Sequence, residues 1–238
     1  RVITSADWMD CFLACCYASI CFVIASMLLQ SMFFSCHVGQ AKNPGPGDEH
    51  CVTLAVCNPN AVHGKIKQLV SLNADVICVS ETSATSVIQK EASTELSKLG
   101  FKSFWSEPVA PKKATLDNRP SFRGEAVGAA VCSSVPARQF RGDIPVVLKE
   151  SQRFSACIIR LGSFEILVIA LYGFANRHRE VKRPNDLLLA SIIPLICSTG
   201  LPFLVCGDFN EPVHKLPAYR FFRHGSGGSL SVVQNPDG

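Results

Sequence analysis

Short apolar runs that end on polar residues recur along this chain. Four of them occupy residues 51–57, 76–80, 164–171 and 203–206. Runs of this length with turn-forming residues at their ends are typical of buried strands. The polar residues that follow them are Asn58, Glu81, Tyr172 with Asn176, and Asp208 with Asn210. Because α/β sheets carry functional groups at the carboxyl ends of their strands, these side chains are candidates for one common site.

The stretch Gly207-Asp208-Phe209-Asn210 is the most informative of these strand ends. Side chains alternate along an extended segment, so Asp208 and Asn210 point the same way while Phe209 points to the other face. Gly207 allows the backbone to bend or a neighbouring group to approach closely. A strand followed by an ordinary Asx turn has the same pattern, so this stretch alone leaves a structural and a functional interpretation open.

Helices are expected between these strands. Apolar residues recur at helical spacing within residues 62–72, and Thr85-Ser86 can cap a helix that ends at Gly100. A further helix is predicted at residues 185–197. The alternation of strands and helices indicates an α/β fold.

A hairpin is predicted at residues 154–171, because only Gly162-Ser163 separates its two apolar halves. The sheet is therefore partly antiparallel, which argues against a fully parallel, doubly wound arrangement. The other predicted elements are strands at 101–105, 123–132 and 230–233 and a short helix within 216–224.

The N-terminal part of the chain has a different composition. No charged residue occurs from Cys11 to Cys36, and this run exceeds the roughly 20 apolar residues that span a bilayer. It is either a transmembrane or leader helix or an extension outside the folded unit. Two prolines and two glycines within residues 41–48 predict a linker. We therefore expect an apolar segment at 1–40, a linker at 41–48 and a folded domain at 49–238.

Composition narrows the class of protein. With 238 residues, of which 47% are hydrophobic, the chain can bury a substantial core and is not a disordered protein. Its net charge of +4 is compatible with a phosphate-bearing partner. No Cys-x-x-Cys pair of a zinc site occurs, and we expect the cysteines within apolar runs to be free core residues in a reducing compartment. These are Cys57, Cys78, Cys132, Cys157, Cys197 and Cys206.

The polar residues at the strand ends suit one kind of chemistry. Carboxylate and amide oxygens without cysteine or histidine form a ligand set for a hard cation, Mg²⁺ or Mn²⁺. Such an ion neutralises phosphate oxygens and helps to generate a nucleophilic water. The predicted reaction is therefore hydrolysis of a phosphodiester or a phosphomonoester.

Five short motifs follow one another along residues 49–224. They are Asn58-Pro59, Ser80-Glu81-Thr82, Arg123-Gly124, Leu171-Tyr172-Gly173 and Gly207-Asp208-Phe209-Asn210. In order and spacing this set resembles the endonuclease/exonuclease/phosphatase superfamily. Residues 108–111, 132–138 and 210–213 add a resemblance to the apurinic-like endonuclease domain of non-LTR retrotransposons. The resemblance implies an α/β fold of the DNase I-like type, a two-sheet β-sandwich flanked by helices on both outer faces in four layers.

The same resemblance implies catalytic roles for five residues. Glu81 would bind the metal ion, and Asn58 would support that ion or the phosphate. Tyr172 would contact the scissile phosphate. Asp208 would orient or deprotonate the attacking water, and Asn210 would hold Asp208 and the phosphate in place.

The resemblance further implies that the chain binds nucleic acid. Arg123, Arg138 and Asn176 are the residues expected to contact it. The implied partner is a target-site DNA duplex, and the implied location is the nucleus. The alternative location is a membrane, with contact through residues 11–36.

Two departures from the family pattern bear on activity. Ser83 follows Glu81-Thr82 where relatives often have a histidine. The Ser-Asp-His motif that ends the family's catalytic domain is missing, and His214 and His224 are interpreted as ordinary surface histidines. We therefore expect a domain that is incomplete at its C-terminus and weak or inactive as a nuclease. A membrane-anchored phosphoesterase of the same superfamily and a non-enzymatic remnant or binding module are the open alternatives.

Overall fold

The computed structural model describes residues 21–22, 34–38, 52–111, 124–175, 182–224 and 233–234. Its strands are β1 (Cys21–Phe22), β2 (Phe34–Val38), β3 (Val52–Cys57), β4 (Val76–Ser80), β5 (Lys102–Trp105), β6 (Ala129–Ser133), β7 (Ala137–Gln139), β8 (Phe154–Leu161), β9 (Phe164–Tyr172), β10 (Phe203–Asp208) and β11 (Val233–Gln234). Its helices are α2 (Ile66–Val70), α3 (Ser86–Lys98), α4 (Val146–Ser151), α5 (Lys182–Ser191), α6 (Ile193–Thr199) and α7 (Tyr219–His224), with a 3-10 turn, η1, at Val213–Lys215.

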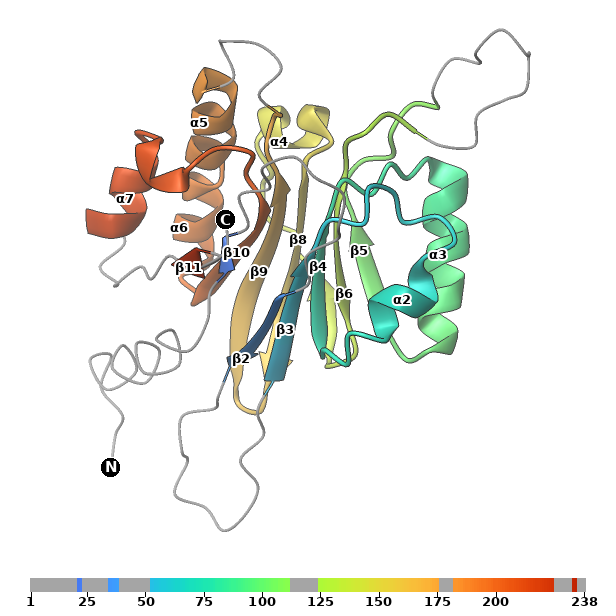
Figure 1. Cartoon of the computed structure of the whole chain (residues 1–238). Coiled ribbons are helices and arrows are strands. Elements are labelled where there is room, and N and C mark those ends of the chain that lie inside the picture. Colours follow the sequence, from blue (N-terminus) through green and yellow to red (C-terminus); the bar gives the residue numbers. More distant parts are fainter. Residues whose placement is uncertain are drawn as a thin grey trace, which may run out of the picture.

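Two mixed sheets stack face to face (Figure 1). One has the strand order β2-β3-β4-β6-β5 and the other has the order β10-β9-β8-β7. β3 runs parallel to β4, and β9 runs parallel to β10. β8 and β9 form the hairpin expected around Gly162-Ser163. The predicted α/β fold with an antiparallel part is therefore confirmed.

Three apolar clusters separate four layers of structure. One cluster fills the space between the two sheets. A second packs α2 and α3 against the outer face of the β3-β4-β6 sheet, and a third packs α4 to α7 against the outer face of the β8-β9-β10 sheet. Figure 1 shows α2 and α3 on one side of the sandwich and α5, α6 and α7 on the other. The predicted two-sheet sandwich with helices on both outer faces is confirmed.

The continuous apolar run of β9 follows from this layering. Leu167, Ile169 and Leu171 pack beneath the helices, and the residues between them pack against the other sheet. Because both faces of the strand are buried, neither face needs polar residues. After the partly exposed Glu165 near its start, β9 therefore has no polar side chain before the one at its end, Tyr172.

The predicted helices form, with changes in their bounds. Thr85 caps α3 by accepting a hydrogen bond from the backbone N–H of Ile88 at 3.4 Å. The helix expected at 185–197 is instead two helices, α5 and α6, which meet at Ile192. Pro194 causes the break, because proline lacks an N–H group and fits only in the first turn of a helix.

Two elements were missed by the sequence analysis. β7 lies where a turn-rich connection was expected, and α4 follows it with Leu148 buried. With three and six residues, these elements are too short to show a period. The strand expected at 123–132 is the shorter β6, and the strand expected at 230–233 is described only as β11.

The apolar N-terminal run contributes β2 to the first sheet, where it pairs antiparallel with β3. β1 pairs with β11 in a separate two-stranded ribbon. Within the described ranges, no helix is both long and apolar enough to cross a bilayer. The expected linker at 41–48 lies outside the described residues, so the division into parts stays a prediction.

Five of the six cysteines that were expected in the core are found there. Cys57, Cys78, Cys132, Cys157 and Cys206 are free and buried. Burial raises the pKa of the Cys57 and Cys157 thiols to about 12. Cys197 is free but exposed near the end of α6, so the expectation that it belongs to the core was wrong.

Candidate active site

Four strands bring predicted site residues to one edge of the sandwich. Asp208 and Tyr172 form the last pair of the parallel β10–β9 ladder. In the other sheet, β3 and β4 run in parallel and end just before Asn58 and Glu81. Parallel strands end at the same edge, so residues that are far apart in sequence meet there.

The side-chain amide of Asn58 bridges the two acids. Its Nδ2 donates to Glu81 Oε2 at 3.2 Å and to Asp208 Oδ2 at 3.0 Å. Asn58 Oδ1 accepts the backbone N–H of Asn60 at 3.0 Å, which turns the NH2 group toward the carboxylates. Two acids from different sheets are thereby held within the reach of one amide nitrogen.

Tyr172 donates to the same Glu81 oxygen. Its phenol lies 2.9 Å from Glu81 Oε2, while the residue itself is 5% exposed. Burial, followed by the charge of Glu81 and this hydrogen bond, raises the pKa of the Tyr172 phenol well above its usual range. Tyr172 is therefore a protonated hydrogen-bond donor at neutral pH.

Asp208 is the more buried of the two acids, with 4% of the residue exposed. Burial raises the pKa of its carboxyl group, and the nearby charge of Glu81 acts in the same direction. The hydrogen bonds from Asn58 and from the backbone N–H of Asn210 lower this pKa and partly offset the effect of burial. A carboxylate with a raised pKa is a better proton acceptor than an exposed one.

Ser80 ties the two sheets together beneath the acids. Its hydroxyl donates to the backbone carbonyl of Leu171 and accepts the backbone N–H of Asp208, both at 3.1 Å. The serine is fully buried. Within the Ser80-Glu81-Thr82 motif, Ser80 therefore fixes the position of the ends of β9 and β10 relative to the end of β4.

Gly207 permits the close approach that the sequence suggested. Its φ is +146°, and a Cβ atom would lie 1.8 Å from the carbonyl oxygen of Leu171. Gly173 on the neighbouring strand exit is similarly confined, since a Cβ there would lie 2.1 Å from the Phe209 carbonyl oxygen. Residues 173–174 after β9 and 209–210 after β10, the two strand exits, thus pack backbone against backbone.

Asn210 holds both strand exits. Its backbone N–H donates to Asp208 Oδ1 at 3.0 Å, and its Nδ2 donates to the Gly173 carbonyl at 3.0 Å. Its φ of +52° is a left-handed conformation that asparagine tolerates better than most residues. The alternation expected for an extended segment therefore ends at Asp208.

Backbone strain is concentrated at these strand ends. Glu81, Ser83, Asn60 and Ala61 have φ values of +53°, +49°, +53° and +133°. Non-glycine residues adopt such values at a cost of about 1–3 kcal/mol each, and they cluster at functional sites. Glu81 adopts its left-handed conformation directly after β4, and its carboxylate there accepts hydrogen bonds from Asn58 and Tyr172.

Arg153 is a charged neighbour that the sequence analysis missed. Its guanidinium lies 5.0 Å from the ring centroid of Tyr172 and 4.1 Å from that of Phe174. It donates to the backbone carbonyls of Tyr172 at 3.3 Å and Gly173 at 2.8 Å. Burial lowers the pKa of this guanidinium, while Tyr172 and Glu81 act to raise it. Arg153 directly precedes β8, where no motif marks it in the sequence.

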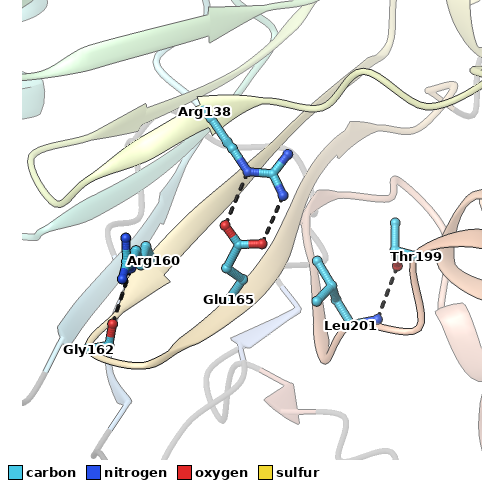
Figure 2. A network of polar contacts seen from close by, with 6 residues as sticks. All are labelled: Arg138, Arg160, Gly162, Glu165, Thr199 and Leu201. Atoms are coloured by element: carbon cyan, nitrogen blue, oxygen red, sulfur yellow. Dashed lines mark hydrogen bonds and ion pairs between the residues drawn. The ribbon is translucent and has the colours of Figure 1, made fainter.

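The three residues expected to contact nucleic acid lie elsewhere or outside the described residues. Arg138 pairs with Glu165 through two hydrogen bonds of 3.1 and 2.8 Å (Figure 2). Glu165 is seven positions before Tyr172 along β9, or about 23 Å at the rise of a strand. The structure thus places Arg138 away from the acids, and Arg123 and Asn176 are not among the described residues.

The donor set fits a magnesium ion held partly by its substrate. Among the described residues, no group of three or more His, Cys, Asp or Glu side chains could hold a metal ion. Mg²⁺ usually takes one or two protein carboxylates and completes its shell with water and substrate phosphate. Glu81 would supply such a carboxylate, and Asp208 lies beside it, joined to it through the Asn58 amide.

Comparison with known proteins yields structural likeness alone. No family model and no curated protein matches the chain. The 3′ phosphatase NExo from Neisseria, bound to a product DNA hairpin, is 15% identical with a TM-score of 0.46, over 67% of this chain and 58% of that chain. An AP endonuclease from Archaeoglobus fulgidus is 17% identical with a TM-score of 0.45, over 77% of this chain and 65% of that chain.

A third similar structure is the endonuclease domain of TRAS1, a telomere-specific non-LTR retrotransposon. It is 15% identical with a TM-score of 0.40, over 67% of this chain and 59% of that chain. The chain spans less than two thirds of the length of each of these three structures. With TM-scores below 0.5, they do not assign a function, which has to be inferred from the side chains of the site.

Proposed function

We propose that this chain is a Mg²⁺- or Mn²⁺-dependent phosphodiesterase of the endonuclease/exonuclease/phosphatase superfamily. The observation that carries the proposal is the amide of Asn58, which holds Glu81 and Asp208 together from the ends of three strands. Like charges that share a site oppose each other's ionisation and do not favour folding. Such an arrangement is typical of acids that serve a cation or transfer a proton.

The two acids suit different roles. Glu81 is the more exposed one, so its carboxylate is the one that we assign to the metal ion. Asp208 has the raised pKa of a proton acceptor and would take the proton of the attacking water. The bound ion would neutralise the phosphate oxygens and favour the nucleophilic form of that water.

The neutral groups suit binding of the phosphate. Tyr172 keeps its proton at neutral pH and would donate it in a hydrogen bond to a phosphate oxygen. Asn58 and Asn210 hold Asp208 from both sides, through Oδ2 and Oδ1. The carboxylate is thereby fixed in one orientation before substrate arrives, which lowers the cost of reaching the transition state.

We further propose that the substrate is DNA and that the chain acts as the endonuclease domain of a non-LTR retrotransposon. The motifs within residues 108–111, 132–138 and 210–213 support this assignment. We expect turnover to be slow, because Ser83 stands where many relatives have a histidine. A serine hydroxyl cannot carry the positive charge of an imidazolium group.

The test is nicking of a supercoiled plasmid by the full-length chain with Mg²⁺ or Mn²⁺, and with both ions removed by chelation. Asp208→Asn and Glu81→Gln remove one charge each and keep the shape of the side chain. We expect either variant to lower the rate by about 100-fold or more, since general acid–base catalysis contributes about 10²–10⁴-fold. Asp143→Asn, at an exposed position, is the matched control and should keep the rate.

Three outcomes would contradict parts of this proposal. Robust nicking that survives Asp208→Asn would remove Asp208 from the mechanism. Metal-dependent hydrolysis of phospholipid headgroups or soluble phosphate esters, without nicking, would identify the alternative phosphoesterase. Cooperative folding without binding of Mg²⁺ or DNA would identify a non-enzymatic module.

A further inference from the structure

Asn185 of α5 connects the two strand exits from outside the sheet. Its Oδ1 accepts the backbone N–H of Phe174 at 2.6 Å. Its Nδ2 donates to the carbonyl of Phe174 at 3.1 Å and to the carbonyl of Phe209 at 3.3 Å. The side chain thus binds three backbone groups, one or two residues after Tyr172 and Asp208.

These bonds join a contact between the exits that is already tight. The Gly173 N–H donates to the Asp208 carbonyl at 2.6 Å, and the Asn210 side chain donates back to the Gly173 carbonyl at 3.0 Å. The exits also lie too close for a Cβ at Gly173. Asn185 is anchored in a helix, so it sets where this pair of exits stands relative to the α5 layer.

The burial of Asn185 makes this arrangement costly to change. The residue is 3% exposed, and water cannot easily replace its bonds to Phe174 and Phe209. A buried polar group that loses its partner keeps the full cost of its removal from water. The next residue, Asp186, accepts the backbone N–H of Ala218 at 2.6 Å, so the same turn of α5 also holds the segment before α7.

We propose that Asn185 is a positioning residue of the active site, which fixes the Tyr172 phenol relative to the Asp208 carboxylate through the backbone of the two exits. This inference rests on the proposed phosphodiesterase function. Asn185 has no contact with the acids themselves among its described hydrogen bonds. It therefore acts through the backbone of the two exits, and we expect its main effect to be on turnover.

The test compares the full-length chain with Asn185→Ala, Asn185→Ser and a control variant. Asn185→Ala removes all three bonds, and Asn185→Ser is a milder change that leaves a hydroxyl group in place. The control is Asp75→Asn, at the amino end of β4, where Asp75 accepts the backbone N–H of Thr53 at 2.8 Å. Kinetics are measured well below the melting temperature of each variant, so that only folded protein contributes.

Two readouts are recorded. In Mg²⁺-dependent cleavage, we expect Asn185→Ala to lower kcat by about 10- to 100-fold with KM unchanged, because small misplacements of reacting groups have effects of this size. In amide hydrogen exchange by NMR, we expect faster exchange at Gly173 and Asn210, whose N–H groups bond to Asp208. Asn185→Ser should lie between wild type and Asn185→Ala, and Asp75→Asn should change neither readout.

Unchanged kcat in both Asn185 variants, or unchanged exchange at Gly173 and Asn210, would overturn the inference. A parallel loss of kcat in Asp75→Asn of equal stability would also overturn it, since the effect would then be one of general destabilisation. If wild type shows no metal-dependent cleavage, the proposed function fails. The amide exchange then decides by itself whether Asn185 positions the two exits.

Discussion

Removal of the bridging amide is the sharpest test of the site. Asn58→Ala takes away the hydrogen bonds to Glu81 Oε2 and Asp208 Oδ2, and leaves the two carboxylates facing each other. The Asn58 bond lowers the pKa of Asp208, while burial and Glu81 raise it. The variant therefore raises the pKa of Asp208 above its wild-type value.

The size of this effect follows from the strength of the lost bond. A hydrogen bond to a charged group contributes about 1.5–3 kcal/mol. Asp208 is 4% exposed, so solvent screening reduces this value little. With 1.4 kcal/mol per factor of ten, the ionisation constant of the Asp208 carboxyl group falls about 10- to 100-fold.

The assay is a pH titration of the aspartate side-chain carboxyl carbons by NMR, which needs no activity. Asn60→Gly is the control, because it removes an exposed amide two residues away and keeps the positive φ of +53° accessible. We expect a large upward shift of the Asp208 pKa in Asn58→Ala and none in Asn60→Gly. An unchanged or lowered Asp208 pKa in Asn58→Ala would refute the bridge as described.

The same variant makes a prediction for stability. The pKa of Asp208 is higher in the folded state than in the unfolded state. At pH values between these two pKa values the folded state binds more protons, so stability decreases as pH rises through this range. Asn58→Ala raises the folded-state pKa further, so it extends this pH range upward. Its loss in the free energy of unfolding should therefore be larger at neutral than at acidic pH in urea unfolding. An equal loss at both pH values would refute the assignment of the bond to the ionised carboxylate.

Two further predictions concern stability. Gly207→Ala should lower the free energy of unfolding by about 2–4 kcal/mol, because its Cβ would lie 1.8 Å from the Leu171 carbonyl oxygen. Gly200 has a φ of +61°, and no atom lies within 4 Å of the Cβ that alanine would add. Gly200→Ala should therefore lower the free energy of unfolding only by the cost of a left-handed alanine, about 1–2 kcal/mol. Equal losses for the two variants in urea unfolding would contradict the close approach at Gly207. Thr82→Val should leave stability unchanged or raise it by about 1 kcal/mol, because Thr82 Oγ1 is buried without a hydrogen-bond partner in the part of the chain that the structure describes. A clear loss of stability in thermal melts of Thr82→Val would show that its hydroxyl has a partner.

The strands could be predicted from the sequence because their burial is nearly complete. From Ile166 to Leu171 the residues facing either side of β9 are apolar, so the strand is visible as a run, and the next polar residue, Tyr172, marks its end. The cap at Thr85 and the hairpin at Gly162-Ser163 were predicted from local backbone chemistry. β7 and α4 were not predictable in this way, because a three-residue edge strand and a six-residue helix are stabilised by the neighbours against which they pack.

The order of residues along the chain determined which chemistry could occur. Asn58, Glu81, Tyr172 and Asp208 each follow an apolar run, and carboxylate and amide oxygens of this kind suit a hard cation. The local pattern of apolar and polar residues is sufficient to locate these side chains, because an apolar run ends where the strand leaves the buried core.

Only the tertiary structure decided how these groups are joined. The bridge from Asn58 to Asp208 spans 150 positions of sequence, and that from Tyr172 to Glu81 spans 91. Ser80, Arg153 and Asn185 bond to backbone groups in or directly after other strands, and such partners cannot be seen in the local sequence pattern. Contacts of this kind depend on the register and stacking of two sheets, which are set by packing of the whole core.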